Sequence, residues 1–389
     1  MYNIQTMNKI AKVGLNKLNP DLYCVSDTAE NPDGILVRSA KLHDMEFGSN
    51  LLCIARAGAG TNNIPIDRCT DNGIVVFNTP GANAEAVKEL AICALLLAGR
   101  DIAGGIEWVK SIAGEGDGVA AMVEKGKSQF VGPELKGKAL GVIGLGAIGA
   151  RIASTATHLG MEVYGYDPYL SVDAAWSLSS HVIHAKTVDE IYEKCDYITL
   201  HIPYIPATKH TVNAETIAKM KDGVRIINLA RGELVNDDDM LAALESGKVA
   251  KYVTDFPNGK TAGVKNIIAM PHLGASTPES EDNCAVMASL ELADYIENGN
   301  IKNSVNMPTA VIARTGDPRL CVIHKNIPNV IAKLTEYISA QGINIENMMN
   351  ASLKGKPNAY TIIDTDKAPA NAVEKLMGIE GVVRVRVIK

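Results

Sequence analysis

The chain has 389 residues, enough for two or three domains at about 150 residues each. Its apolar and charged fractions are ordinary for a globular protein. A net charge of -6 disfavours broad binding to nucleic acid or to an anionic membrane, because both require a basic surface. A small anionic substrate remains compatible, since a few arginines in one cleft outweigh a mildly acidic exterior.

The seven cysteines are scattered, without Cys-x-x-Cys spacing, and several lie inside apolar runs. This pattern favours buried thiols in a reducing compartment. No Cys, His and carboxylate cluster has the spacing of metal ligands, so no metal site is expected. The first ten residues lack an apolar core of signal-peptide length, and no segment approaches a membrane span. We therefore expect a cytoplasmic protein.

Short β-rich runs at 35–39, 52–58 and 74–79 are separated by turn residues and leave room for crossover helices. This rhythm predicts parallel βαβ units. Residues 84–99 are apolar nearly all round, which predicts a buried helix. A glycine-punctuated stretch with few periodic positions follows at 113–137.

A second α/β block opens with the strand ALGVIGLG and runs to about residue 280. Its further strand candidates are VYGYD, YITLHIP, RIINLAR, YVTDF and IIAMPH. A helix is expected at about 282–298. The last seventy residues read strand, helix, strand, strand, helix, strand, which predicts a separate ferredoxin-like domain.

The most specific local signal is a G-x-G-x-x-G motif that follows an apolar strand and opens a helix. Gly144 permits a tight turn, Gly146 lets backbone N–H groups approach a pyrophosphate, and Gly149 lets helix and strand pack closely. The helix N-terminus supplies partial positive charge for the phosphates. Asp167 ends the next strand at the distance expected for a carboxylate that binds the ribose hydroxyls. A carboxylate there repels a 2′-phosphate, so NAD is favoured over NADP.

Two strand ends carry candidate catalytic groups, and ligands bind at such ends in open α/β sheets. Arg231 follows an apolar strand, so its guanidinium can fork onto a carboxylate and polarise the adjacent carbonyl. His272 ends a buried strand, and as a neutral imidazole it can take a hydroxyl proton. His201 ends another strand and is expected beside the cofactor. The pattern predicts hydride transfer between NAD and a small 2-hydroxy acid.

These motifs together resemble the D-isomer-specific 2-hydroxyacid dehydrogenases over essentially the whole chain. The resemblance is carried, in order, by ARAGAGTNNIPID, NTPGANAEAVKEL, GVIGLGAIG, NLARGELV, TDFPN and PHLGASTPES. It implies an α/β protein with two doubly wound parallel-sheet domains and a C-terminal ferredoxin-like βαββαβ domain that resembles an ACT domain. The implied substrate-binding domain is discontinuous, 1–95 and 283–308, with an NAD-binding Rossmann domain inserted at 96–282. The implied ACT regulatory domain covers 318–389.

Within the family, the motifs are most similar to those of members that oxidise D-3-phosphoglycerate to 3-phosphohydroxypyruvate, the first step of serine biosynthesis. The resemblance implies that Arg231 and His272 form the catalytic pair and that Asp255 holds the nicotinamide amide. Further cofactor contacts are implied at Ala147, Ile148, His201, Ala230 and Gly274, and substrate contacts at Arg38, Ser39, Ala57, Gly58, Ala59, Gly60 and Asn83. A phosphorylated hydroxy acid carries about three negative charges, and Arg38, Arg56 and Arg231 are expected to converge on it.

One departure from the family pattern concerns the catalytic histidine. The family usually places a glutamate after the TDFP-like strand, where it pairs with the histidine. This chain has FPNGKTAG, with Asn258, Gly259 and Lys260 and no acid. Either Glu279 or Glu281 substitutes, or His272 works without a partner. We favour a weakly supported imidazole.

The C-terminal domain offers a candidate effector site for L-serine. His324, Asn326 and Asn344 match the ligand contacts of related serine-inhibited enzymes, but Asn329 replaces the usual glycine at the strand–helix turn. A purely dimerising module is the alternative. The resemblance also implies a homodimer through the NAD domains, or a homotetramer through ACT pairing.

Two rival functions remain open from the sequence. One is a dehydrogenase for another 2-hydroxy acid, such as glycerate, lactate or 2-hydroxyglutarate. The other is a non-catalytic, NAD-sensing binding protein.

Overall fold

The computed structural model describes residues 1–170, 172–176 and 178–389. The chain forms two compact units, of which unit 1 comprises Met1–Asn83 with Pro278–Lys389 and unit 2 comprises Ala84–Thr277. Unit 2 is therefore inserted into unit 1. The sequence placed these breaks at residues 95 and 283. In the structure the first break falls after Asn83, because residues 84–99 form one continuous helix that packs within unit 2.

Unit 2 contains a seven-stranded parallel sheet with the order β12-β11-β10-β9-β6-β7-β8. Its strands are β6 (Ala139–Ile143), β7 (Glu162–Tyr166), β8 (Val182–His184), β9 (Tyr197–Leu200), β10 (Val224–Asn228), β11 (Val249–Thr254) and β12 (Ile267–Ala269). The strand order reverses between β6 and β9. Such a switch point opens a crevice at the carboxyl ends of the strands, where ligands bind in doubly wound sheets.

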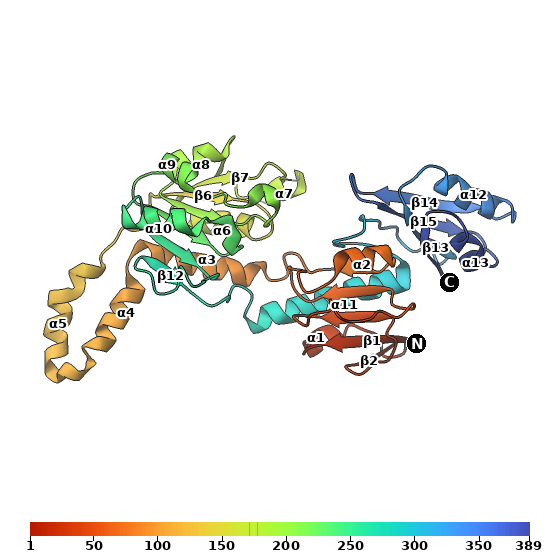
Figure 1. Cartoon of the computed structure of the whole chain (residues 1–389), viewed down its shortest axis with the longest axis horizontal. Helices are drawn as coiled ribbons and strands as arrows, with labels where there is room; N and C mark the ends of the chain where they lie inside the picture. Colours follow the sequence, from red (N-terminus) through yellow and green to blue (C-terminus); the bar gives the residue numbers. More distant parts are fainter. Residues whose placement is uncertain (171, 177) are drawn as a thin grey trace. The chain divides into compact units, whose positions relative to one another are not determined.

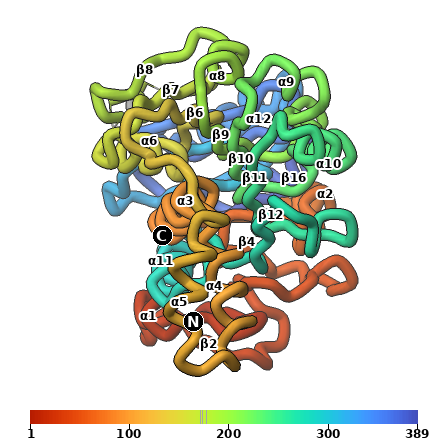
Figure 2. Tube along the Cα trace, turned by 90° about the vertical axis from the view of Figure 1, so that its left-hand side faces the viewer, coloured from red at the N-terminus to blue at the C-terminus, as the bar shows by residue number. Residues whose placement is uncertain are grey.

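Helices cover both faces of this sheet (Figures 1 and 2). One face carries α3 (Ala84–Gly99) and α6 (Gly149–His158), and the other carries α8 (Val188–Lys194), α9 (Ala214–Lys219) and α10 (Asp237–Glu245). The short helix α7 (Val172–Trp176) and the 3-10 turns η3 (Pro206–Thr208) and η4 (Gly232–Leu234) lie in the connections. The prediction that α3 is buried all round was too strong, because its Cys93 and Leu96 are exposed.

A helical arm projects from the rest of unit 2 (Figure 1). It consists of α4 (Ile102–Ser111), η1 (Ala113–Gly118), α5 (Val119–Gly126) and η2 (Lys127–Phe130). The sequence predicted no helix in 113–137, because glycines interrupt the apolar period there. Trp108 of α4 contacts Phe130 with ring centres 5.4 Å apart, which holds the two halves of the arm together.

The first part of unit 1 is a five-stranded parallel sheet with the order β2-β1-β3-β4-β5. Its strands are β1 (Tyr2–Met7), β2 (Tyr23–Ser26), β3 (Gly34–Val37), β4 (Cys53–Arg56) and β5 (Val75–Phe77). The sequence predicted β3, β4 and β5 but not the first two. The helices α1 (Lys12–Leu15) and α11 (Pro278–Asn298) pack on one face, and α2 (Ile66–Asp71) packs on the other.

The C-terminal part of unit 1 is an antiparallel sheet with the order β14-β15-β13-β16. Its elements are β13 (Arg319–Lys325), α12 (Val330–Ser339), β14 (Ile345–Ser352), β15 (Asn358–Thr365), α13 (Ala372–Met377) and β16 (Val382–Ile388). This is the predicted βαββαβ order, and with the two parallel sheets it confirms the predicted fold class.

The C-terminal sheet is not a detached module. One face is covered by α12 and α13. From the other face, Cys321, Tyr360 and Ile362 join the hydrophobic core that contains Phe77 and Tyr295 of the N-terminal part. The sequence predicted a separate domain, because several of the contacts that join the two parts, such as that of Asn358 with Thr70, link residues more than 200 positions apart.

Glu291 of α11 is a buried carboxyl in unit 1, with one oxygen that accepts a hydrogen bond from Asn303 (2.7 Å). Burial raises the pKa of Glu291 to about 7, although the Asn303 hydrogen bond and Lys302 oppose the shift. The folded chain therefore keeps a proton that the unfolded chain releases near its ordinary pKa of 4.5. Stability attributable to this group falls as pH rises from about 4.5 to about 7.

We expect Glu291→Gln to raise the free energy of unfolding at pH 8 by up to about 3.5 kcal/mol, since the pKa is raised by about 2.5 units at about 1.4 kcal/mol per unit. The same variant should change little at pH 4, where both states are protonated. Denaturant unfolding at the two pH values measures this difference. Equal effects at both would contradict it.

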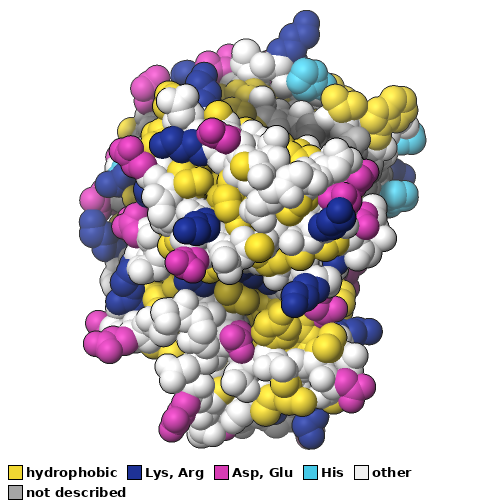
Figure 3. Space-filling view, turned by 90° about the vertical axis from the view of Figure 1, so that its right-hand side faces the viewer, with side chains coloured by type: hydrophobic (Ala, Val, Ile, Leu, Met, Phe, Trp, Pro, Cys, Tyr) yellow, Lys and Arg dark blue, Asp and Glu magenta, His cyan; other side chains and the backbone are white. Residues whose placement is uncertain are grey.

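Among the described residues, no helix is long and apolar enough to cross a membrane. Within the same residues, no group of three His, Cys, Asp or Glu side chains is arranged to hold a metal ion. All seven cysteines are free thiols, and Cys24 and Cys93 are exposed, so the prediction of buried thiols was wrong for those two. Figure 3 shows one face of the molecule, on which basic and acidic side chains are interspersed.

Candidate active site

The turn between β6 and α6 has the geometry of a dinucleotide cradle. Gly144 adopts a φ of +94°, and a Cβ there would lie 2.5 Å from the carbonyl oxygen of His201. A Cβ at Gly149 would collide with the carbonyl oxygen of Gly144. Gly146, in contrast, has no protein atom within 4 Å of its Cβ position. Two glycines are therefore required by packing, whereas Gly146 leaves open space beside the backbone.

The surroundings of this turn fit a pyrophosphate. Gly146 and Ala147 are exposed and Ile148 is half-buried, and although the Ala150 N–H donates to the Gly146 carbonyl (3.0 Å), the first turn of α6 points its N–H groups toward this exposed turn. A helix N-terminus with free N–H groups attracts phosphate.

Asp167 lies at the end of β7, next to the cradle. Its Oδ2 accepts a hydrogen bond from the Leu145 N–H (2.9 Å), and its Oδ1 accepts one from the Tyr169 N–H (2.9 Å). These bonds hold the carboxylate beside the glycine turn, as its expected role toward a ribose requires.

His201 follows β9, across the switch point from β6. Its Nε2 lies 2.8 Å from the Thr199 hydroxyl. Burial lowers the pKa of the imidazole to about 3, so the ring is neutral at pH 7. A neutral His201 is suited to a polar contact with a cofactor but not to electrostatic binding of an anion.

Arg231 and His272 lie against the same aromatic ring. Arg231 follows β10, and its guanidinium carbon is 5.9 Å from the centre of the Phe256 ring. His272 follows β12, and its ring centre is 4.6 Å from that of Phe256. Both side chains are exposed. The structure thus places the predicted pair at one edge of the sheet, both close to the phenylalanine that follows the intervening strand, β11.

Asp255 precedes Phe256 and is 1% exposed. Its Oδ2 accepts a hydrogen bond from the Gly274 N–H (3.3 Å), while its Oδ1 is buried and has no partner within the described residues. Burial raises the pKa of Asp255, and the charges of His272 and Arg231 oppose the shift. An unpaired buried oxygen is costly, and the carboxamide of a nicotinamide supplies the N–H donors that this oxygen requires. The residues present therefore fit NAD.

Asn228 and Phe256, which the sequence analysis missed, hold Arg231 in place. Asn228, the last residue of β10, is fully buried, accepts from the Ala230 N–H (3.2 Å) and donates to the Arg231 carbonyl (2.8 Å). These bonds fix the turn after the strand. Phe256 provides the surface on which the guanidinium and imidazole lie. The sequence could have indicated Asn228, because it is a polar residue at the end of an apolar strand. No local sequence pattern indicated a role for Phe256.

The residues that stand where the family usually has a glutamate form structural contacts in this chain. The side chain of Asn258 donates to Asp237 (2.8 Å), and Lys260 forms an ion pair with Asp238 (2.7 Å). Within the described part of unit 2, no carboxylate forms an ion pair with His272. Packing against Phe256 is the contact that orients the imidazole.

The predicted substrate residues of unit 1 gather at the ends of β3 and β4. The Nε of Arg56 donates to the Arg38 carbonyl (3.0 Å), so the two arginines are neighbours. The guanidinium of Arg38 forms an ion pair with Glu281 of α11 (2.8 Å). Ser39 donates its N–H to Asn8 (3.0 Å). Within unit 1, the partner of Glu281 is thus Arg38.

The loop from Ala57 to Gly60 follows β4 and is held by backbone contacts. The Thr79 N–H donates to the Gly58 carbonyl (3.2 Å), and Asn78 donates to the Ala59 carbonyl (2.6 Å). The Oδ1 of Asn83 is buried without a partner among the described residues. It is a free acceptor at the end of this part of unit 1.

The three predicted effector residues do not surround one ligand within a chain. His324 is 2% exposed, and its ring atoms contact the Lys325 carbonyl (2.7 Å) and the Thr361 hydroxyl (2.9 Å). Asn344 is exposed, and its N–H donates to Asp366. Asp366 lies two residues after Asp364, which pairs with Arg319, so Asn344 lies at the Arg319 end of the sheet. His324 lies five residues from Arg319 along β13, about 17 Å at 3.3 Å per residue. Asn326 is exposed at the His324 end.

The substitution Gly146→Ala should weaken nucleotide binding without changing the stability of the fold. We expect the unfolding midpoint to stay unchanged, because no protein atom meets the added methyl group. NADH affinity, measured by fluorescence titration, should fall tenfold or more, about 1.4 kcal/mol, because the methyl group fills the space that the pyrophosphate needs. Gly259→Ala, at another open glycine of unit 2, is the matched control. Unchanged NADH affinity in Gly146→Ala would contradict the cradle.

The fold and site define a Rossmann-type dinucleotide-binding unit that carries an arginine–histidine pair. Residues 93–274 match the family described as "D-isomer specific 2-hydroxyacid dehydrogenase, NAD binding domain". D-3-phosphoglycerate dehydrogenase of Haemophilus influenzae is 30% identical over 361 residues, which cover 88% of this chain and 83% of the relative. The chain belongs to the D-isomer specific 2-hydroxyacid dehydrogenase family.

Other relatives carry the same name but match over less of their length. D-3-phosphoglycerate dehydrogenase of Synechocystis sp. is 34% identical over 73% of this chain and 50% of the relative. The match to several such relatives thus spans about half of their length. Among solved structures, NAD+-bound 3-phosphoglycerate dehydrogenase from Entamoeba histolytica is 27% identical, with a TM-score of 0.62, over 78% of this chain and 98% of that one.

Proposed function

We propose that the chain is an NAD-dependent dehydrogenase that oxidises D-3-phosphoglycerate to 3-phosphohydroxypyruvate. The observation that carries the proposal is that Arg231 and His272 both lie close to Phe256, next to Asp255, whose Oδ1 has no hydrogen-bond partner among the described residues. A carboxylate-binding cation, a proton acceptor and a nicotinamide contact are the groups that oxidation of a 2-hydroxy acid requires.

Each residue has a defined role in this chemistry. NAD+, when bound, accepts a hydride from the carbinol carbon. Arg231 binds the substrate carboxylate through its guanidinium fork and polarises the neighbouring oxygen. His272 takes the hydroxyl proton on its imidazole and returns it in the reverse direction. Asp255 orients the nicotinamide amide, and Phe256 keeps the imidazole in position.

The choice of a phosphorylated substrate rests on unit 1 and on the relatives. Arg38 and Arg56 place two positive charges at neighbouring strand ends. Several relatives are named D-3-phosphoglycerate dehydrogenases. The two arginines at these neighbouring strand ends suit the phosphate of such a substrate.

The direct test is an absorbance assay at the NADH band with 3-phosphoglycerate, or with 3-phosphohydroxypyruvate in reverse. We expect turnover to exceed that with glycerate, lactate or 2-hydroxyglutarate. Faster turnover of an unphosphorylated acid would assign a different substrate. NADH binding without turnover of any of them would assign a binding protein.

Glu281 competes with the substrate for Arg38 in this proposal. An exposed ion pair is worth about 0.2–1 kcal/mol, so Glu281→Gln should lower KM for the phosphorylated substrate about two- to fivefold and leave kcat unchanged. Glu279→Gln is the control. If Glu281→Gln instead lowers kcat and shifts the pH profile, Glu281 is the carboxylate partner of His272.

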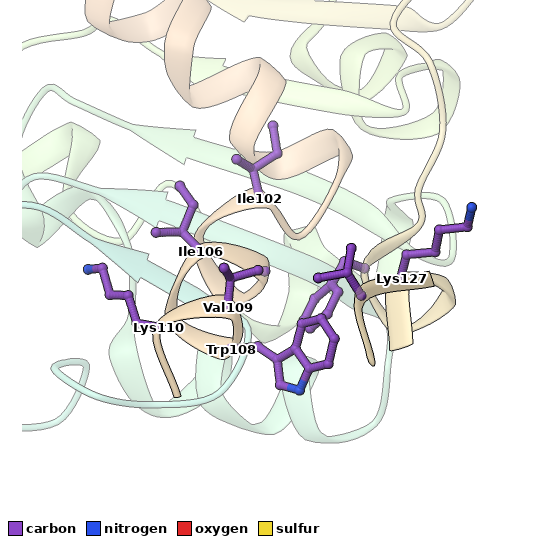
Figure 4. A pocket seen from close by; sticks show the side chains of 9 residues that line it. Ile102, Ile106, Trp108, Val109, Lys110 and Lys127 are labelled. Carbon is purple, nitrogen blue, oxygen red and sulfur yellow. The ribbon is translucent and has the colours of Figure 1, made fainter. Parts of the chain in front are cut away.

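The arm of unit 2 is our proposed contact with a second copy of the chain. An apolar hollow of about 470 Å³ opens between its helices (Figure 4). Its lining includes Ile102, Ile106, Trp108, Val109, Val123 and Phe130, with Lys110 and Lys127 beside them. Helix α4 has no buried residue, and Ile106 is 52% exposed. Two short helices without a core need a partner, and paired arms from two copies would cover both apolar faces.

The oligomeric state tests this contact. Wild-type protein should behave as a dimer in size-exclusion chromatography with light scattering, and Ile106→Glu with Val109→Glu should shift it to a monomer. Leu290→Glu, at an exposed leucine of unit 1, is the control. A dimer that survives the arm substitutions would place the interface elsewhere.

L-Serine is the proposed effector of the C-terminal domain, with Asn326 and Asn344 as exposed contacts. Because His324 and Asn344 lie at opposite ends of the sheet, such a site requires residues from two copies. Equilibrium dialysis with labelled L-serine should show saturable binding that Asn344→Ala weakens. No saturable binding would leave the domain a purely structural module.

A further inference from the structure

The last strand of the chain places an arginine beside one from the N-terminal part of unit 1. Arg384 lies on β16 and Arg68 on α2. The end of α2 contacts the C-terminal sheet directly, since Asn358 of β15 donates to the Thr70 carbonyl (3.0 Å). Arg68 and Arg384 line one hollow of about 340 Å³.

Both guanidinium groups are held in place by backbone carbonyls. Arg384 donates to the carbonyls of Leu51 (2.5 Å), Asn72 (3.1 Å) and Ser49 (3.3 Å). Arg68 donates to the carbonyls of Leu42 (3.0 Å) and Met45 (2.7 Å), and its guanidinium carbon is 4.6 Å from the centre of the Phe47 ring. These bonds use some of the guanidinium N–H groups, and they fix the orientation of the remaining ones before any ligand arrives.

The positive charge at this junction is not balanced by carboxylates. Among the described residues of unit 1, neither Arg68 nor Arg384 forms an ion pair, and the Nε of Arg68 is buried without a hydrogen-bond partner. Arg386 adds a third guanidinium, which donates to the carbonyls of Tyr295 and Ile296. Glu46 is the acidic residue that lines the hollow, and it is exposed.

We infer that this hollow is a binding site for a small oxyanion, a phosphate or carboxylate group, held between Arg68 and Arg384. Forked N–H donors of fixed geometry bind such groups through charge-assisted hydrogen bonds. The hollow is within the size range of small-ligand pockets, about 300–1,000 Å³.

An anion bound here would bridge α2 and β16 and so strengthen the contact between the C-terminal sheet and the N-terminal part of unit 1. The site differs from the proposed substrate residues, since it uses neither Arg38 nor Arg56. The inference does not depend on the proposed reaction.

The test uses the full-length chain carrying Arg38→Gln, which weakens anion binding at the proposed substrate residues. Inorganic phosphate and citrate are titrated separately by calorimetry, so that a preference between phosphate and carboxylate is measured. Glu46→Gln removes the carboxylate that lines the hollow among the described residues. We expect it to tighten binding about two- to fivefold, whereas Glu336→Gln, on the exposed side of α12, leaves binding unchanged.

Arg68→Gln removes a positive charge from the hollow, whereas Glu46→Gln removes a negative one. In protein whose circular dichroism is native, Arg68→Gln should weaken anion binding at least tenfold. If Arg68→Gln fails to fold, the comparison of Glu46→Gln with Glu336→Gln decides the matter. Equal binding by these two variants, or wild-type binding by folded Arg68→Gln, overturns the site.

Discussion

His272→Asn should lower kcat for the proposed oxidation of phosphoglycerate by about 10²–10⁴-fold, the usual contribution of a positioned general base. Asparagine is close in size and still packs on Phe256, but it cannot accept the hydroxyl proton. NADH affinity should stay within twofold of wild type, because the cradle at Gly144–Gly149 is unchanged. Stopped-flow absorbance and NADH fluorescence titration measure the two quantities separately.

His184→Asn is the matched control, since His184 is exposed at the end of β8. A kcat in His272→Asn within tenfold of wild type would remove His272 from the proton transfer. If NADH binding is lost as well, the substitution has disturbed the Asp255–Gly274 contact rather than the chemistry.

Arg231→Gln should lower kcat/KM by about 10²–10³-fold or more. Each hydrogen bond to a charged group contributes about 1.5–3 kcal/mol, and the fork makes two of them with one carboxylate. Arg231→Lys keeps the charge but loses the planar fork, so it should recover only part of the loss. Initial rates against substrate concentration give the comparison.

Arg100→Gln, at an exposed arginine after α3, controls for the loss of one positive charge in unit 2. Full recovery by lysine would show that charge alone is sufficient at position 231. Wild-type kcat/KM in Arg231→Gln would contradict its role in carboxylate binding.

The nucleotide cradle was predictable from the sequence because its motif is local. The close packing at Gly149 comes from Gly144 itself, and Asp167 follows one helix later, whereas the contact that excludes a Cβ at Gly144 comes from His201, distant in the sequence. The parallel sheet of unit 2 was predictable for the same reason, since apolar runs of strand length alternate with helical segments. The pair of Arg231 and His272 was found because strand ends of one parallel sheet share an edge.

Other features depended on contacts between distant residues. The two strands at the start of the chain were missed, because polar residues interrupt β1, and its partner β2 has only four residues. The pairing of Arg38 with Glu281 joins residues more than 200 positions apart, and the sequence left Glu281 as a candidate partner of His272. The short helices of the arm were hidden by glycines.

The amino-acid sequence by itself determined the order of elements, the glycine turn and the residue types at the strand ends, because short-range sterics and periodicity encode these. Only the tertiary structure brought the arginine and the histidine to the same phenylalanine, Phe256, and left Oδ1 of Asp255 without a hydrogen-bond partner among the described residues. It also joined the C-terminal sheet to the N-terminal part and brought Arg384 to Arg68. Such contacts arise from side-chain packing across the fold, and no local pattern in the chain specifies them.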